Sequence, residues 1–352
     1  MTNEDSIRDH SLTAKTVSRW LWQSGTLSRG TVLKIKVELD IKTTISRLIF
    51  LTATYSTDSP FDLPLQLVVK SPLVAPHRSD EFEGEINFYR QLAPMLGTPP
   101  TVRCLAAFEE SDGYSETLVL EDLRATHDHP PWPIPPSRKQ CELALDALIR
   151  LHAQWWESSK LGRTIGQPHT PESLRTMVQR IGTQIPAFFD SLGGSLPKDA
   201  RPIYESAFDS LLRPWMRLTD SRALTIIHGD AHTWNFLYPR AGQGPAFLID
   251  WQLWHVDVGA RDLAFLMALH WYPSLRRELE EPLLRYYYEG LRAHGIDNYS
   301  FDDLRLDYRR CVVRNLTIPI LFWSRGMEPE GWWHRLECAL AAYRDLKCEE
   351  LL

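Results

Sequence analysis

Apolar residues change their spacing part of the way along the chain, and this change limits the folds that are possible. Between Thr31 and Ile41 apolar and polar residues alternate, which is the pattern of a half-buried antiparallel strand. Between Arg138 and Trp156 apolar residues recur every fourth position, which is typical of a helix with one buried face. A segment with five prolines, Thr126 to Pro136, separates the two patterns. We therefore expect two regions with different secondary structure.

The residues before the proline-rich segment predict a β-rich unit that contains little helix. A short helix is expected over Thr13 to Trp22, and Glu81 to Leu92 has helical spacing as well. The expected strands are Thr31 to Ile41, Ile45 to Tyr55, Leu65 to Lys70, Val102 to Glu109 and Thr117 to Leu120.

The residues after the proline-rich segment are mostly helical in pattern, most clearly from Leu279 to Ala293 and from Asp302 to Ile318. The exceptions are two short apolar runs, Leu224 to Ile227 and Ala246 to Ile249, which we interpret as paired strands of one hairpin. The predicted fold class is therefore α+β, with a β-rich N-lobe over residues 1–123 and a larger helical C-lobe over residues 124–352.

Charge and cysteine content exclude several classes of protein. The chain of 352 residues carries a formal net charge of −6, so a role in binding nucleic acid is not expected. Five cysteines without a CxxC spacing predict neither disulfides nor a structural zinc site. The acidic N-terminus does not resemble a secretory signal, and no apolar run is long enough to span a membrane. We therefore expect a soluble, cytoplasmic protein without a membrane partner.

The segment from Ile227 to Asp250 contains the residues most suited to chemistry. Asp230 follows one apolar run, Asn235 lies five residues later, and Asp250 ends the next run. Oxygen ligands at these positions suit Mg²⁺, and a further carboxylate can orient a hydroxyl group, as phosphoryl transfer requires. Asp230 alone could be a turn-capping carboxylate. His228, Asp230 and His232 could instead bind a transition metal ion in a metallohydrolase.

The motif HGDAHTWN, followed by LIDWQ, resembles the signature of the aminoglycoside phosphotransferase and choline-kinase superfamily. Within it the chain is most similar to the ecdysteroid-kinase-like branch, also called CHK-kinase-like. The resemblance covers most of the chain and implies a bilobal protein-kinase-like fold. It also implies ATP and Mg²⁺ as cofactors and an alcohol group on a small molecule as the acceptor.

The resemblance assigns a role to each matching residue. Asp230 would be the catalytic base, and Asn235 and Asp250 would hold Mg²⁺ on the nucleotide phosphates. Lys70 would contact the α- and β-phosphates, and Glu85 would pair with it. Lys70 could otherwise be a charge on an edge strand, and the glutamates around Glu85, including Glu81, could be a solvated helix face.

The segment LVLEDL, Leu118 to Leu123, matches the hinge that presents backbone groups to adenine, which places Glu121 and Leu123 at the nucleotide. Glu121 and Asp122 could also form a plain turn. The loop that covers the phosphates is expected between Ser24 and Gly30, although no GxGxxG is present there. Further along, Asp262 is interpreted as a structural residue at a helix start, and Asp257 as a possible helper of the metal site.

Aromatic residues in the C-lobe suggest a substrate pocket with aromatic walls, next to basic residues such as Arg314 and Arg325. The expected function is therefore ATP- and Mg²⁺-dependent phosphorylation of a hydrophobic or weakly charged alcohol. An aminoglycoside-type antibiotic kinase, a non-catalytic pseudokinase and the metallohydrolase remain as alternatives, and the sequence does not indicate the oligomeric state. The aromatic and basic candidates are Trp254, Trp271, Tyr272, Trp323, Arg325, Trp332 and Trp333.

Overall fold

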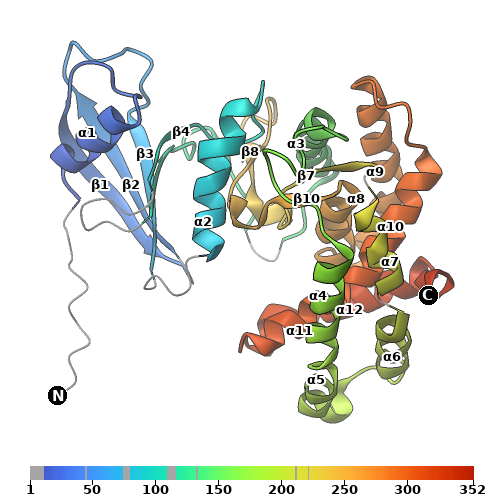
Figure 1. Ribbon diagram of the computed structural model, residues 1–352. Coiled ribbons are helices and arrows are strands. Elements are labelled where there is room, and N and C mark those ends of the chain that lie inside the picture. The colour runs from blue at the N-terminus through green and yellow to red at the C-terminus, as the bar shows by residue number, and fades with distance from the viewer. Residues whose placement is uncertain are drawn as a thin grey trace, which may run out of the picture. The chain divides into compact units, whose positions relative to one another are not determined.

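In the computed structural model the protein forms two compact units (Figure 1). The first unit comprises residues 1–95 and 101–127, and the second comprises residues 96–100 and 128–352. The residues that the structure describes are 12–43, 46–73, 80–108, 116–131, 134–210, 212–220 and 222–352.

The first unit is built on a five-stranded antiparallel sheet with the strand order β1-β2-β3-β5-β4. Alternating apolar residues turn one face of this sheet towards a core that includes Leu51, Leu67 and Val69. The strands are β1 (Val32–Lys42), β2 (Ser46–Tyr55), β3 (Gln66–Pro72), β4 (Cys104–Phe108) and β5 (Thr117–Glu121). Every strand predicted in this unit is therefore present. The half-buried face expected for Thr31 to Ile41 is wrong, however, because most apolar side chains of β1 are exposed.

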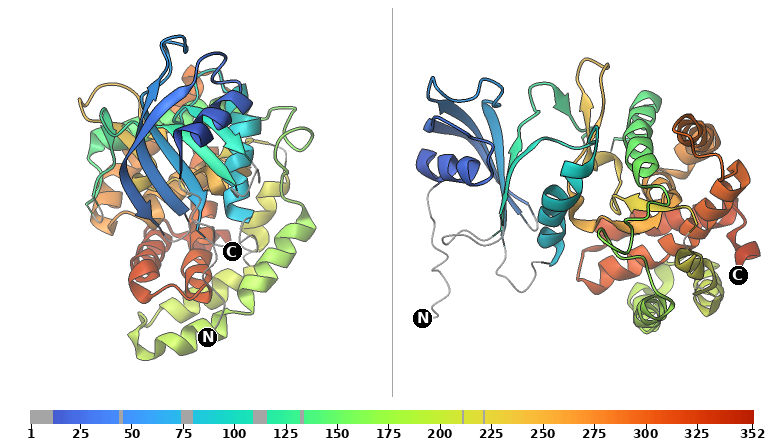
Figure 2. Two further views of the ribbon diagram at one scale, coloured as in Figure 1. Left: turned by 90° about the vertical axis from the view of Figure 1, so that its left-hand side faces the viewer. Right: turned by 45° about the horizontal axis from the view of Figure 1, so that its top comes forward.

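Helix α1 (Ala14–Gln23) covers the core face of the sheet (Figure 2). The side chain of Thr13 accepts a hydrogen bond from the N–H of Thr16 and so begins the helix. Trp20 and Leu21 of this helix are buried in the core. The apolar stripe of α1 therefore completes the core of the first unit.

The second helix of this unit differs in detail from the sequence expectation. α2 (Asp80–Asn87) is continued by a wider π-helical turn, Phe88–Leu92, and a 3-10 turn, Ala93–Met95. The segment Ser24 to Gly30, predicted to cover the phosphates, connects α1 to β1. It is therefore not the connection between β1 and β2, which follows Lys42. Residues 44 and 45 of that connection lie outside the described residues.

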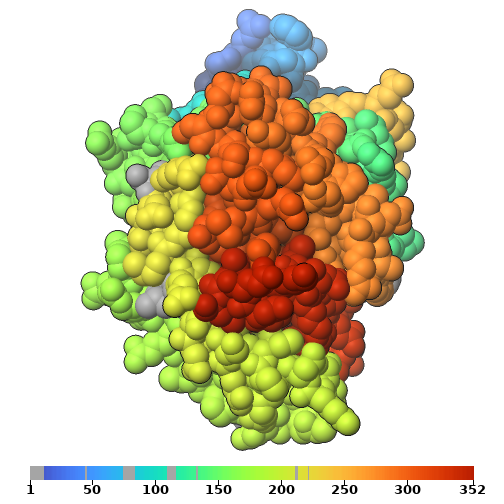
Figure 3. Space-filling view, turned by 90° about the vertical axis from the view of Figure 1, so that its right-hand side faces the viewer, coloured from blue at the N-terminus to red at the C-terminus, as the bar shows by residue number. Residues whose placement is uncertain are grey.

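The second unit is mainly helical, as the spacing of apolar residues predicted. Its first long helix begins at a capping box, in which Ser137 and Gln140 exchange hydrogen bonds. Its helices are α3 (Arg138–Trp155), α4 (Pro171–Gly182), α5 (Ile185–Leu192), α6 (Ala200–Ser210), α7 (Leu212–Met216), α8 (Ala260–Leu263), α9 (Pro273–Ala293), α10 (Phe301–Asn315), α11 (Thr317–Ser324) and α12 (Pro329–Asp345). In Figure 3 the red C-terminal residues lie between the orange helices and the yellow-green α6.

The helix predicted over Asp302 to Ile318 is two helices, because α10 ends at Asn315 and α11 begins at Thr317. Pro319 has no N–H to donate to a carbonyl group one turn earlier, so a continuous helix is disfavoured at this point. Among the described residues, no helix is both long enough and apolar enough to pass through a lipid bilayer.

The short strands of the second unit are paired differently from the prediction. β7 (Leu224–Ile227) pairs with β10 (His255–Val258), and β8 (Phe236–Pro239) pairs with β9 (Phe247–Leu248). The single hairpin predicted from the two apolar runs is therefore wrong. Buried runs this short carry no alternation, so their sequence does not indicate which strand is the partner. β6 (His127–Asp128) lies where the first unit ends.

Candidate active site

The turn after β7 brings together the three residues that the motif singled out. The amide of Asn235, in a 3-10 turn (Thr233–Asn235), donates to the backbone carbonyl of Asp230 at 2.9 Å and to its carboxylate at 3.1 Å. The N–H of Ile249 donates to the carbonyl of Asn235 at 3.0 Å, which places Asp250 beside the same turn. The Nδ2 atom of Asn235 is thus occupied, whereas its Oδ1 atom accepts no hydrogen bond within the described residues.

The carboxyl group of Asp230 has an unusual environment for an aspartate. Burial and the nearby charge of Asp250 together raise its pKa to about 7, although Arg335 and the amide of Asn235 act in the opposite direction. Its side chain keeps 19% of its surface exposed. A carboxylate with a pKa near neutrality is suited to accept a proton from an alcohol.

The backbone at Asp250 is in a left-handed conformation, with φ of 64° and ψ of 59°. Residues other than glycine rarely adopt this conformation, and they do so mostly where a site requires it. The ring of the buried His228 lies next to it, with Nε2 2.9 Å from the carbonyl of Ile249. Because that carbonyl only accepts, His228 donates through Nε2 and ties the turn to the strand before Asp250.

The geometry at His228 is unfavourable for the metallohydrolase. Nε2 donates to a carbonyl group, and Nδ1 lies 3.3 Å from the N–H of Asp230, which donates to it. Neither nitrogen is left for a metal ion. Among the described residues, the group whose ligand atoms lie close enough for a metal ion is His169, His255 and Asp257.

Asp257, interpreted from the sequence as a possible helper of the metal site, has a different partner. Its buried carboxylate is held by both terminal nitrogens of Arg314, at 3.1 and 2.6 Å. This pairing keeps the pKa of Asp257 well below its usual range, against the effect of burial. Arg314, which was expected next to the substrate pocket, is buried in this pair, and Asp257 balances its charge.

Asp262 is a site residue that sequence reasoning underestimated. It lies in α8, at the helix start that was expected, but its carboxylate is completely buried. It accepts hydrogen bonds from the backbone N–H groups of His228 at 2.8 Å and Gly229 at 2.9 Å. Its Oδ2 also lies 3.2 Å from Nε2 of His152, whose Nδ1 lies 2.7 Å from the hydroxyl of Tyr287. Asp262 therefore holds the backbone that leads into Asp230.

Lys70 and Glu85 form a buried ion pair in the first unit. Nζ of Lys70 lies 2.6 Å from Oε2 of Glu85, and both side chains are almost inaccessible to solvent. β3 lies between β2 and β5, so the interpretation of Lys70 as an edge-strand charge is wrong. The side chain of Glu81, the other candidate partner, lies outside the described residues.

Most backbone groups of the segment after β5, which was expected to be a hinge, are occupied within the chain. The N–H of Glu121 donates to the carbonyl of Arg103 at 2.9 Å, and the carbonyl of Leu123 accepts from Thr126 and His127. Within the described part of the chain, the N–H of Leu123 donates to no acceptor. That N–H is available to a ligand.

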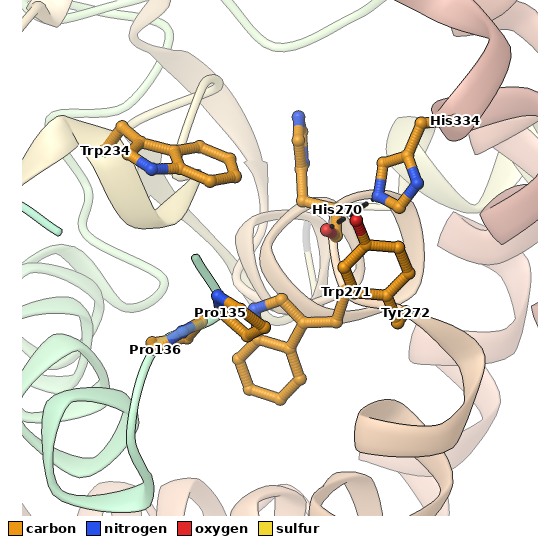
Figure 4. Close-up of a pocket in the computed structure, with 7 residues that line it drawn as sticks. All are labelled: Pro135, Pro136, Trp234, His270, Trp271, Tyr272 and His334. Carbon is orange, nitrogen blue, oxygen red and sulfur yellow. Dashed lines mark hydrogen bonds between the residues drawn. The ribbon is translucent and has the colours of Figure 1, made fainter. Parts of the chain in front are cut away.

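A small pocket lies in the second unit, close to the turn that carries Asp230. Its volume is about 110 Å³. Figure 4 shows Trp234 on one side, His334 and Tyr272 on the other, and His270 between them. The ring of His232 connects this pocket to Asp230, because its centroid is 5.3 Å from that of His270 and its Nε2 is 3.7 Å from Asp230 Oδ2. The lining residues are Pro135, Pro136, Trp234, His270, Trp271, Tyr272 and His334.

Two of the aromatic residues proposed from the sequence, Trp271 and Tyr272, line this pocket. Trp323 and Trp332 instead pack edge-on against Phe188, so they are not pocket walls. Arg335 was not proposed, although its guanidinium lies beside His270. No spacing in the sequence indicates that a residue so far from the motif would reach it.

The chain belongs to the phosphotransferase enzyme family, whose model matches residues 56–295. An aminoglycoside-phosphotransferase-like protein from Ralstonia eutropha JMP134 is similar in structure, with a TM-score of 0.59 and 16% identity over 95% of this chain and 98% of that one.

Two other solved structures are similar to this chain. An ethanolamine kinase from Plasmodium vivax has a TM-score of 0.55 and 9% identity over 89% of this chain and 81% of that one. The GDP complex of aminoglycoside 2'-phosphotransferase-IIIa has a TM-score of 0.51 and 14% identity, over 91% of this chain and 94% of that one. No curated protein sequence matches the chain. The predicted α+β kinase-like fold is confirmed, and the family to which the chain belongs is one of phosphotransferases.

Proposed function

We propose that the protein uses ATP and Mg²⁺ to phosphorylate a hydroxyl group on a small molecule, as an ecdysteroid-kinase-like (CHK-kinase-like) enzyme. The observation that carries this proposal is the pairing of Asp230 with Asn235 beside Asp250, in a turn that Asp262 holds by its backbone. A base next to oxygen ligands for a hard cation is the arrangement that phosphoryl transfer requires.

The residues beside Asp230 fit Mg²⁺. Asp250 and Asp230 are close enough for one charge to raise the pKa of the other carboxyl group, and a divalent cation relieves this repulsion. Asp250 and the Oδ1 atom of Asn235 would hold the ion, since Mg²⁺ prefers carboxylate and carbonyl oxygens. When bound, the ion would offset negative charge on the nucleotide phosphates.

Residues of the chain would carry out proton transfer and would bind the nucleotide. Asp230 would orient the acceptor hydroxyl and take its proton as the new P–O bond forms. Lys70, held by Glu85, would contact the α- and β-phosphates, and the backbone at Glu121 and Leu123 would face adenine. We assign nucleotide binding to residues 1–123 and catalysis with acceptor binding to residues 124–352. We propose ATP as the phosphoryl donor. Because a similar structure was solved with GDP, GTP is the alternative donor to test.

The pocket suits a hydrophobic or weakly charged alcohol acceptor. Aromatic rings and prolines form most of its lining, and no carboxylate is found among the residues that line it. A polycationic aminoglycoside needs acidic groups nearby, so this observation disfavours the antibiotic-kinase alternative. The pseudokinase alternative is disfavoured because Asp230, Asn235, Asp250 and Lys70 are all retained.

A screen for ADP release tests the proposal. Purified protein is incubated with Mg-ATP and a panel of alcohols that includes sterol-like, aromatic and aminoglycoside members. We expect ADP release that depends on one class of alcohol and stops when Mg²⁺ is chelated. Asp230→Asn is the matched negative control, because it keeps the shape of the side chain but cannot accept the proton. Alcohol-dependent ADP release at an unchanged rate in this variant would rule out the proposed site.

A further inference from the structure

Arg335, on α12, holds a positive charge beside the turn that carries Asp230. Its Nε donates to Nε2 of His270 at 3.1 Å, and one terminal nitrogen donates to the carbonyl of Gly331. The guanidinium carbon lies 5.0 Å from the ring centroid of Phe322. These three contacts fix the plane of the guanidinium group.

The arrangement leaves one end of the guanidinium group available. Within the described residues no carboxylate lies within ion-pair distance of Arg335, and its Nη2 atom donates to no acceptor there. The partners of Arg335 are a carbonyl and an imidazole, both neutral. A partly buried guanidinium group without a carboxylate partner is costly unless an anion binds it.

His270 fixes the orientation of the Arg335 guanidinium group. Its Nδ1 lies 2.8 Å from the carbonyl of Phe265, and because a carbonyl only accepts, Nδ1 carries the proton. Nε2 of His270 is therefore unprotonated and accepts the Nε–H of Arg335, so the imidazole ring is neutral. Since His270 is buried, the orientation of Arg335 is set by the fold.

The rings of His270 and His232 connect Arg335 with the turn that carries Asp230. Arg335 contacts His270, the rings of His270 and His232 lie 5.3 Å apart, and Nε2 of His232 lies 3.7 Å from Asp230 Oδ2. The charge of Arg335 also lowers the pKa of Asp230. The guanidinium group therefore lies close enough to Asp230 for its charge to act there, although Arg335 is not one of the residues that line the pocket.

The pocket supplies a second, independent indication. The indole of Trp271 is 2% exposed, and its Nε1–H donates to no acceptor in the part of the chain that the structure describes. Figure 4 shows this residue at the pocket, together with His270 and Pro135. An indole N–H can only donate, so a ligand that satisfies it must present an acceptor atom such as an oxygen.

We propose that the acceptor is a hydroxy acid, an alcohol that carries one carboxylate near its hydroxyl, and that Arg335 binds this carboxylate. A single guanidinium group matches one negative charge and the planar pair of oxygens of a carboxylate. The same positive charge next to Asp230 excludes acceptors whose hydroxyl is flanked by ammonium groups. This inference rests on the proposed function, because it uses Asp230 as the group that receives the hydroxyl.

A series of three alcohols that differ only in charge tests the inference. 3-(Hydroxymethyl)benzoate, 3-(hydroxymethyl)benzamide and 3-(hydroxymethyl)benzylamine share one ring and one hydroxyl. Binding of each is measured by calorimetry without nucleotide, and phosphorylation is measured as ADP release with Mg-ATP. We expect the benzoate to bind at least about tenfold more tightly than the benzamide, and the benzylamine to bind most weakly.

Variants of Arg335 test whether this residue causes the expected preference for the benzoate. Arg335→Gln removes the charge and should bring the three affinities within about threefold of one another, whereas Arg335→Lys should keep part of the preference. Arg344→Gln is the matched control, because Arg344 lies on the same helix and pairs with Asp199 at the surface. It should leave the order of the three affinities unchanged. The wild-type order remains a test by itself if Arg335→Gln fails to fold.

The two readouts separate this inference from the proposed function. If the benzoate binds in an Arg335-dependent way but no alcohol supports ADP release, the phosphotransferase assignment fails and the anion site stands. A preference for the benzylamine, or no measurable binding of the benzoate, overturns the inference. A third result overturns it as well: Arg335→Gln slows ADP release equally with all acceptors and raises KM for ATP. The guanidinium would then serve the phosphoryl group.

Discussion

The carboxylate of Asp262 holds the backbone of His228, accepting its N–H at 2.8 Å while the other oxygen accepts the N–H of Gly229 at 2.9 Å. The residue after Gly229 is Asp230, so the position of the proposed base is set by a carboxylate more than thirty residues away in the sequence. Burial acts to raise the pKa of Asp262, but these hydrogen bonds and His152 together hold it below its usual value. Asp262 is therefore ionised and its oxygens are saturated with donors.

Asp262→Asn is expected to lower both stability and turnover. An amide cannot accept at both ends, so one buried N–H loses its partner, which costs on the order of 2–4 kcal/mol in the free energy of unfolding. The displaced turn should lower kcat at least about tenfold while binding of Mg-ATP changes less. Urea denaturation and steady-state kinetics measure the two effects, with Asp199→Asn at the surface as control. Normal kcat in a folded Asp262→Asn protein would contradict the positioning role.

The ion pair of Lys70 and Glu85 allows its contribution to stability to be separated from its role in nucleotide binding. Lys70→Met alone leaves Glu85 buried without its cation, which should cost on the order of 3–5 kcal/mol. The double variant Lys70→Met with Glu85→Leu should recover most of this stability, because both buried charges are gone. It should nevertheless lose the rise in melting temperature that Mg-ATP produces. Full stabilisation of the double variant by Mg-ATP would remove Lys70 from the nucleotide site.

The pKa of Asp230 predicts how stability depends on pH. Its pKa of about 7 in the folded state lies above the ordinary aspartate value of 3.8, so between these pH values the folded state holds a proton that the unfolded state releases. The stability that this group contributes is thus full below about pH 4 and is lost as the pH rises through 7. Asp230→Asn removes this loss and should stabilise the metal-free protein at pH 8 by on the order of 2–4 kcal/mol.

The same substitution should have no effect on stability near pH 3.5 and should lower turnover at least about a hundredfold. Thermal denaturation with a chelator present, at both pH values, checks the first effect, and ADP release checks the second. Equal melting temperatures of the two proteins at pH 8 would mean that the carboxyl group of Asp230 has an ordinary pKa.

Asp250 and Asn235 should differ in their contributions to binding of Mg-ATP. Asp250→Ala should abolish the rise in melting temperature that Mg-ATP produces, because a ligand stabilises only the state that binds it. Asn235→Ala should weaken the rise less, since a neutral amide contributes less to holding a cation. The titration is repeated with ATP and chelator to separate the two ligands. An unchanged response of Asp250→Ala would remove it from the metal site.

Local patterns were sufficient to place the strands of the first unit, because short runs rich in apolar and β-branched residues end at turn-forming residues. They did not predict burial, since β5 is buried on both faces whereas most of β1 is exposed. They were also sufficient to bring Asp230 and Asn235 together, because the two residues lie in one turn. The pairing of β7 with β10 was not predicted, since β7 is a buried run without alternation and β10, with four residues, is too short for its pattern to mark it as a strand.

The change from β-rich to helical structure and the residue types at the proposed catalytic turn could be read from the sequence, since both depend on neighbours along the chain. The contacts of Asp262 with the turn, the contact of Arg335 with His270 and the pairing of Asp257 with Arg314 were visible only in the folded chain. These contacts join residues distant in sequence, and an Asp or Arg on a helix looks the same whether it faces water or a buried partner. Burial and the direction of the side chain separate the two cases, and both are properties of the folded chain.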